Sequence, residues 1–189
     1  FLIEGSNCAE NHTMSVRWLR KAKDKGAIII HVDPRFTRTS SIADIYARIR
    51  PGTDIAFLNA MINYILENKH YDEEYVKCHT NALCLVNDDF AFKDGLFAGF
   101  NEAEFGYDKT SWGYQLDPKT KQPLKAEKLD DPGCVFAKMR AFFKRYDMKT
   151  SEKITGIAAE TIKKIADTLI KNRPGTVMYA LGMTQHTVG

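Results

Sequence analysis

The chain has 189 residues, of which 44% are hydrophobic, so it can enclose a core but is near the size of a single domain. Its 27 Lys and Arg residues against 24 Asp and Glu residues give a net charge of +3, too even for a dedicated binder of nucleic acid or membrane surfaces. No apolar run approaches the roughly 20 residues of a membrane span. We therefore expect no nucleic-acid partner and no direct membrane insertion.

The first part of the chain alternates between apolar strands and helices. Residues 1–4 are expected to end a buried strand, and a helix is predicted from Thr13, which can cap it, to Lys25, closed by Gly26. The β-branched run 27–32 predicts a parallel strand buried on both faces, and 45–49 a weaker strand. The helix that follows Asp54 carries a stripe of apolar residues at helical spacing, predicted to pack on the sheet: Ile55, Leu58, Ile62, Ile65 and Leu66.

The second part begins with a short helix near 72–79 and then loses its periodicity. Eight aromatic residues lie between Phe90 and Tyr114, interleaved with polar residues and glycines, so we expect 87–131 to be an ordered insertion that docks on the rest of a large protein or on a partner subunit. Helical spacing returns in 135–146 and 158–170, and 176–181 is predicted to be another buried strand.

This order predicts an α/β fold, a Rossmann-like open and mostly parallel sheet flanked by helices. The expected domain comprises residues 1–86 and 132–189, with 87–131 as the irregular, aromatic-rich insertion. Because the chain opens on an apolar strand without Met and stops just after another strand, we expect a segment of a longer protein.

The four cysteines form no CxxC pair and are too few for a disulfide scaffold. Free, mostly buried thiols are the simplest interpretation, and we expect no metal ligands in this chain. The Cys8-x₃-His12 spacing is interpreted as accidental.

Ligands of open α/β sheets bind at the carboxyl ends of the strands, so the loops that follow the strands are the candidate site. Taken singly, Gly5 and Gly182 suit tight turns, and Asp33 and Thr53 suit helix caps. Together, these loops offer amides for phosphate and acceptors for ribose and base. The first loop lacks the GxGxxG glycines, so the sequence favours a nucleotide but not NAD.

The same loops resemble a known family. They read Gly5-Ser6-Asn7-Cys8-Ala9-Glu10-Asn11-His12, Val32-Asp33-Pro34-Arg35-Phe36-Thr37-Arg38-Thr39, Gly52-Thr53-Asp54-Ile55-Ala56 and Leu181-Gly182-Met183-Thr184-Gln185-His186. In this order they are similar to the loops of molybdopterin oxidoreductases of the dimethyl-sulfoxide-reductase type. Within that superfamily, the tracts Asp94–Phe100 and Tyr107–Asp117 resemble the large catalytic subunit of formate dehydrogenases.

The resemblance implies two molybdopterin guanine dinucleotides around a molybdenum or tungsten ion, one of them lined by this chain. It assigns Gly5, Ser6, Asn7, Glu10 and His12 to the phosphates and pterin, Asp33 and Arg35 to ribose and guanosine, Gly52 and Asp54 to the guanine end, and Gly182, Met183, Thr184, Gln185 and His186 to the pterin near the metal. Asp54 would accept from guanine N–H groups. The metal ligand, the catalytic residues and a 4Fe-4S cluster would all lie outside this segment.

The resemblance further implies oxidation of formate to carbon dioxide, with electrons passed to an iron–sulfur subunit and, as an option, a cytochrome subunit. It favours a periplasmic protein exported through a twin-arginine signal over a cytoplasmic one. Two alternatives stay open at this point: another molybdopterin oxidoreductase of the nitrate or polysulfide type, and a non-catalytic nucleotide-binding or docking domain.

Overall fold

The computed structural model describes residues 1–93 and 95–187, and the chain forms two compact units. Unit 1 consists of Phe1–His70 and Phe143–Gly189, and unit 2 consists of Tyr71–Phe142. Unit 2 thus contains the predicted insertion 87–131 together with the segments on either side of it. Asp94, in one of the tracts quoted above, and the chain end Val188-Gly189 lie outside the described residues.

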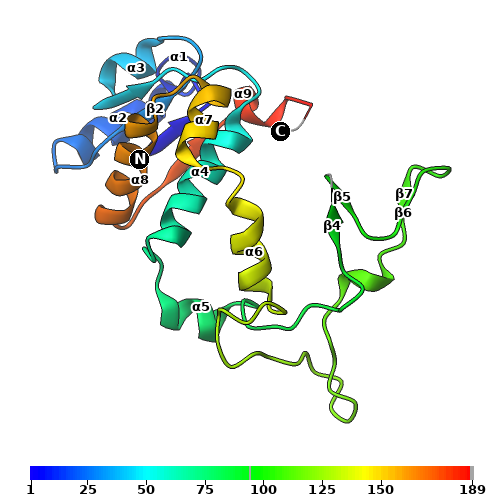
Figure 1. Ribbon diagram of the computed structural model, residues 1–189. Coiled ribbons are helices and arrows are strands. Elements are labelled where there is room, and N and C mark those ends of the chain that lie inside the picture. The colour runs from blue at the N-terminus through cyan, green and yellow to red at the C-terminus, as the bar shows by residue number, and fades with distance from the viewer. Residues whose placement is uncertain (94, 188–189) are drawn as a thin grey trace. The chain divides into compact units, whose positions relative to one another are not determined.

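Unit 1 is built on a parallel four-stranded sheet of order β3-β2-β1-β8 (Figure 1). Its strands are β1 (Leu2–Glu4), β2 (Ile30–Val32), β3 (Ile45–Ala47) and β8 (Val177–Tyr179). Leu2 pairs in register with Ile30 on one side and Val177 on the other. The predicted α/β fold with an open parallel sheet is therefore confirmed.

Helices cover both faces of this sheet. On one face, α4 (Asp54–Glu67) and α8 (Ala159–Lys171), with α7 (Met148–Thr155), enclose a core cluster; its fully buried side chains include Phe57, Ile162 and Ile165. On the other face, α1 (Cys8–Asn11) and α2 (Thr13–Lys23) pack Cys8 and Leu19 against Ile3 and Ile29. The short helix α3 (Arg38–Ile42) follows β2, and its Thr39 and Ser40 are buried.

Three details of the predicted elements were wrong. Helix α2 is preceded by His12 as its N-cap residue, and Thr13 is already helical. On α4 the predicted stripe is correct in part, because Leu66 is buried and Leu58 packs against the core. Ile55 and Ile62 are exposed, however, and the buried residues include Phe57, Ala60 and Met61. This helix has apolar residues around most of its circumference, so periodicity alone does not identify the buried side.

The third error concerns β8, which the sequence predicts to be buried. Val177 and Tyr179 are 54% and 62% exposed, although Met178 between them packs against the core. The strand lies at the edge of the sheet, and neither Val177 nor Tyr179 belongs to the core cluster formed with α4 and α8. The apolar composition of β8 is therefore not enough to bury its side chains at the edge of the sheet.

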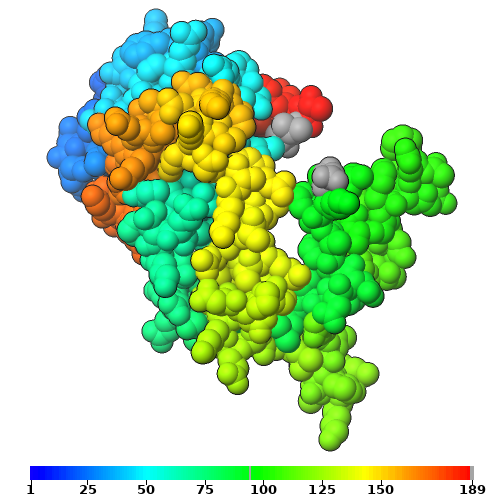
Figure 2. Space-filling model, in the orientation of Figure 1, coloured from blue at the N-terminus to red at the C-terminus, as the bar shows by residue number. Residues whose placement is uncertain are grey.

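Unit 2 carries short elements linked by aromatic contacts. They are α5 (Glu73–His79), β4 (Phe92–Lys93), β5 (Leu96–Phe97), β6 (Phe100–Asn101), β7 (Gly106–Tyr107), η1 (Thr110–Trp112) and α6 (Val135–Phe143). The ring of Phe97 lies 4.9 Å from that of Phe92 and 5.2 Å from that of Trp112. None of the eight aromatic residues of the tract is buried within the described part of the chain. Figure 2 shows the segment that contains them in green.

Among the residues described, no helix has the length and apolarity needed to cross a bilayer. Cys8, Cys84 and Cys134 are buried, Cys78 is exposed, and all four are free thiols. The described residues contain no cluster of three or more His, Cys, Asp or Glu side chains arranged to hold a metal ion.

Candidate functional site

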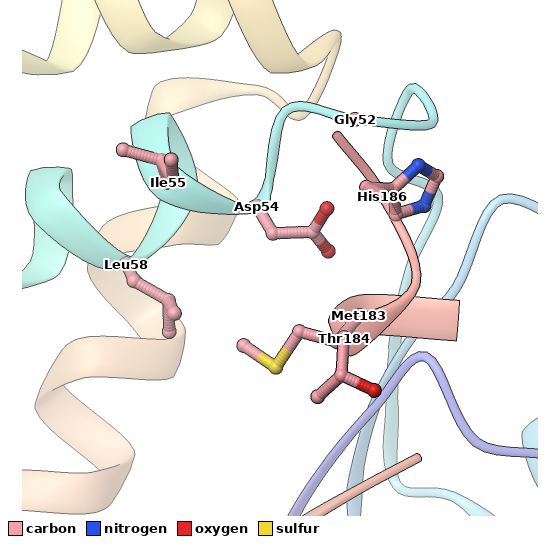
Figure 3. A pocket seen from close by; sticks show the side chains of 7 residues that line it. All are labelled: Gly52, Asp54, Ile55, Leu58, Met183, Thr184 and His186. Atoms are coloured by element: carbon pink, nitrogen blue, oxygen red, sulfur yellow. The ribbon is translucent and has the colours of Figure 1, made fainter. Parts of the chain in front are cut away.

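A pocket of about 170 Å³ lies at the carboxyl edge of the unit 1 sheet (Figure 3). It lies between the start of α4 and the segment around α9 (Leu181–Thr184), which directly follows β8. Its lining consists of Gly52, Asp54, Ile55, Leu58, Met183, Thr184 and His186. Five predicted site residues from two loops are thus brought together: Gly52, Asp54, Met183, Thr184 and His186.

Asp54 is the first residue of α4, and its carboxylate points into the pocket (Figure 3). The preceding loop is fixed by its own contacts: the Thr53 hydroxyl donates to the Arg50 carbonyl at 2.7 Å, and the Arg50 guanidinium donates to the Ile154 carbonyl at 3.1 Å. A carboxylate at the positive end of a helix is electrostatically favoured and accepts N–H groups. The pocket can therefore recognise a ligand with an edge of N–H donors.

The first and last predicted loops meet through their glycines. The Gly182 N–H donates to the Gly5 carbonyl at 3.2 Å, while the Gly5 N–H donates to the Val32 carbonyl at 3.2 Å. Gly5 has a φ of +57°, in the left-handed region that favours glycine. The two glycines thus connect the end of β1 with the pocket-lining segment after β8.

His31 on β2 joins the first loop to the second, and the sequence analysis did not identify it. Its Nε2 donates to the Ser6 carbonyl at 3.2 Å, which leaves Nδ1 to accept from the Ser40 hydroxyl at 2.8 Å. Burial lowers the pKa of His31, although Asp33, with Oδ2 4.0 Å from Nε2, acts in the opposite direction. The ring is therefore neutral near pH 7 and acts as a fixed connector.

Thr39 forms a second connection between these loops. Its hydroxyl donates to Asn7 Oδ1 at 3.0 Å and accepts from the Ala9 N–H at 3.0 Å. The Asn7 amide in turn donates to Glu10, whose other oxygen lies 3.5 Å from Arg38 Nε. Asn7 and Glu10, both predicted to meet the cofactor, thus also make contacts that shape the first loop.

The remaining predicted residues lie outside the pocket lining. Asp33 Oδ1 accepts from the Arg35 N–H at 2.8 Å, and the Arg35 side chain is exposed. His12 Nδ1 lies 2.9 Å from Asn11 Oδ1 on the surface, and Gln185 is exposed after α9. The structure therefore brings these side chains to the same end of the sheet without joining them to Asp54.

Glu4, at the end of β1, is the other residue that the sequence analysis missed. Its side chain is fully buried, and neither carboxyl oxygen has a hydrogen-bond partner among the described residues. Burial, and then the neighbouring Asp54 carboxylate, raise the pKa of Glu4 to about 8. An acidic residue at the end of the apolar run Leu2-Ile3, just before Gly5, was the signal that could have identified it.

The class of protein is shown by a family model that matches the whole chain. The family model described as molybdopterin oxidoreductase matches residues 1–189, so the chain belongs to that family. In structure, it is similar to acetylene hydratase from Pelobacter acetylenicus, with a TM-score of 0.62 over 96% of this chain and 18% of that one. At 21% identity this similarity shows the shared fold.

Two relatives narrow the comparison to one group within the family. The chain is 48% identical to formate dehydrogenase subunit alpha of Megalodesulfovibrio gigas and 46% identical to the nitrate-inducible formate dehydrogenase major subunit of Escherichia coli. Both alignments cover 100% of this chain but 19% of the relative. The chain therefore spans about a fifth of the length of these proteins.

Proposed function

We propose that the chain is the cofactor-binding segment of a formate dehydrogenase catalytic subunit. In this proposal the full subunit oxidises formate to carbon dioxide at a molybdenum or tungsten centre held by two molybdopterin guanine dinucleotides. The observation that carries it is the pocket in which Asp54 meets Met183, Thr184 and His186, in a chain at least 46% identical along its whole length to two formate dehydrogenase subunits.

The hydrogen-bond acceptor of the pocket, the Asp54 carboxylate, fits one end of such a dinucleotide. Guanine presents N1–H and N2–H₂ donors, which a carboxylate such as Asp54 accepts. A Cβ on Gly5 or on Gly182 would meet the backbone of the other loop, so the two loops lie this close because both positions are glycine. When bound, the cofactor would supply the redox chemistry, while the residues of this chain bind and orient it.

The partners and location belong to the same proposal. An iron–sulfur subunit, with a cytochrome subunit as an option, would accept the electrons in anaerobic respiration, and a 4Fe-4S cluster would lie elsewhere in the catalytic subunit. The proposal also includes a periplasmic location, reached through a twin-arginine signal. Cell fractionation of the full-length protein tests the location, and co-purification with an iron–sulfur subunit tests the partner.

The central experiment compares the purified full-length protein with its Asp54→Ala variant. We expect molybdenum or tungsten, pterin and guanine nucleotide in the wild type, together with formate-dependent dye reduction. The variant should lose guanine nucleotide and dye reduction in parallel. Absence of metal and pterin from the wild type would exclude a molybdenum- or tungsten-dependent enzymatic function. Reduction of nitrate or polysulfide without formate oxidation would indicate another oxidoreductase of the same family.

A further inference from the structure

Glu4 has no role in the proposed function, although it is the neighbour of Asp54, which does. Glu4 ends β1 and shares a sheet face with Leu2, because side chains alternate along a strand. That face is the one that α4 covers, and Asp54 opens α4. A buried carboxyl group and a pocket-lining carboxylate thus lie next to each other, one on the sheet and one on the helix.

No donor group serves Glu4. Both of its oxygens are buried without a donor among the described residues, and a buried carboxylate without donors is strongly unfavourable. Two ionised carboxylates offer acceptors alone, so the pair forms no hydrogen bond until one member takes up a proton. Once Glu4 is protonated, its O–H becomes a donor and the Asp54 carboxylate beside it the acceptor.

The surroundings favour the protonated form of Glu4. In the part of the chain described, the ionisable group that affects the pKa of Glu4 is Asp54. The residues that pair with Glu4 in the sheet are Val32 and Tyr179. No cation from these strands neutralises Glu4. Asp54, by contrast, is half-buried at the positive end of a 14-residue helix.

We propose that Glu4 is a positioning residue of the site, which shares one proton with Asp54 and holds the Asp54 carboxylate toward the pocket for the N–H edge of a guanine. The inference rests on the proposed function, because the guanine is the ligand proposed there. It adds a residue outside the pocket lining that sets the orientation and the charge of the recognition group.

The test uses the full-length protein and measures guanine nucleotide released per polypeptide after gel filtration at pH values from 6 to 9. Wild-type content should fall with a midpoint near pH 8, where burial and Asp54 place the pKa of Glu4. Glu4→Gln keeps a neutral donor at every pH, so its content should stay high and its profile flat. Glu4→Leu removes the donor, and its content should be lower by about fivefold or more at pH 7.

Glu67→Gln is the matched control, because it removes an exposed carboxylate from the last residue of the same helix. It should leave both the content and the pH profile of the wild type unchanged. A thermal melt of each variant separates a lost contact from a lost fold, and if Glu4→Leu is unfolded, the Glu4→Gln profile decides. Equal nucleotide contents and pH profiles in wild type and Glu4→Gln would overturn the role of Glu4. Absence of guanine nucleotide and pterin from the wild type would overturn the proposed function itself.

Discussion

Gly5 and Gly182 approach so closely that neither position has room for a side chain. A Cβ on Gly182 would lie 2.6 Å from the Gly5 carbonyl oxygen, and a Cβ on Gly5 would lie 2.7 Å from the Met183 nitrogen. Both contacts are with backbone, which cannot swing aside as a flexible side chain can. The close approach of the loops after β1 and β8 therefore depends on glycine at both positions.

Gly182→Ala should lower the free energy of unfolding by about 1–3 kcal/mol, because the added methyl group forces the two loops apart. Its φ lies outside the left-handed region, so the clash is the main cause. Gly175→Ala is the control, since a Cβ there meets no atom within 4 Å. Thermal melts of the full-length protein compare the two, and equal melting temperatures would contradict the close packing of the loops.

The buried His31 should make unit 1 sensitive to acid. Its pKa is lowered in the fold, so the folded state binds fewer protons than the unfolded state below about pH 6.5. Stability is therefore fully present above that pH and is lost as pH falls through the folded pKa. His31→Gln removes this titration at the cost of a weaker hydrogen-bond network, so its melting temperature should be lower at pH 7.5 but should fall less toward pH 5. A parallel decline in both proteins would show that other groups cause the acid sensitivity.

Glu4 should act in the opposite direction. Its pKa rises from 4.5 to about 8 in the fold, so the folded state holds a proton that the unfolded state releases. The free energy of unfolding then falls as pH increases from 4.5 to about 8, by up to about 5 kcal/mol. Glu4→Gln should remove this decline, which chemical denaturation of the full-length protein at pH 5 and pH 8.5 would measure. An unchanged slope in the variant would mean that Glu4 is ionised without cost.

Thr39→Val should loosen the first loop. The substitution keeps the shape of the side chain but deletes the hydroxyl that bonds Asn7 and the Ala9 amide, which we expect to cost about 1–3 kcal/mol. Ser41→Ala on the same helix removes an exposed hydroxyl and should change stability by less than about 0.5 kcal/mol. Hydrogen exchange of residues 5–12 should increase in Thr39→Val and not in Ser41→Ala. The same exchange in both variants would contradict the role of Thr39.

Trp112 connects the parts of the aromatic tract in unit 2. Its Nε1 donates to the Ala98 carbonyl at 2.8 Å, and its ring lies 5.2 Å from those of Phe97 and Tyr107. Trp112→Phe keeps an aromatic ring but loses the donor, so hydrogen exchange of residues 95–107 should rise by about fivefold. Trp18→Phe on the exposed face of α2 is the control, and an equal response in both variants would exclude a specific role for Trp112.

The sequence predicted the sheet well because its strands are short apolar runs that end in turn-forming residues, as at Gly5 and Asp33. It also indicated which loops lie at the carboxyl edge, because parallel strands present these ends together. It could not predict which side of α4 is buried or that β8 lies exposed at an edge. The buried side of α4 and the exposure of β8 depend on which other elements cover them. The spacing of apolar residues along one strand or helix does not contain that information.

The residues missed at the site share a different property. Glu4, His31 and Thr39 lie within or next to apolar strands and helices, where a polar side chain is interpreted as ordinary strand or cap composition. Their roles come from partners far away in the sequence, such as Asp54 for Glu4 and Asn7 for Thr39. Local spacing therefore identified the loops of the site but not the side chains that connect them.

The strand order also has a consequence for how the chain folds. β1 takes β2 as a neighbour from nearby sequence, but its other neighbour, β8, comes from the far end of the chain. During synthesis one edge of β1 therefore stays unpaired until unit 2 and the second group of helices have been made. The pocket takes its lining from both Gly52 and His186, so it is complete only after the whole segment between these residues has been made.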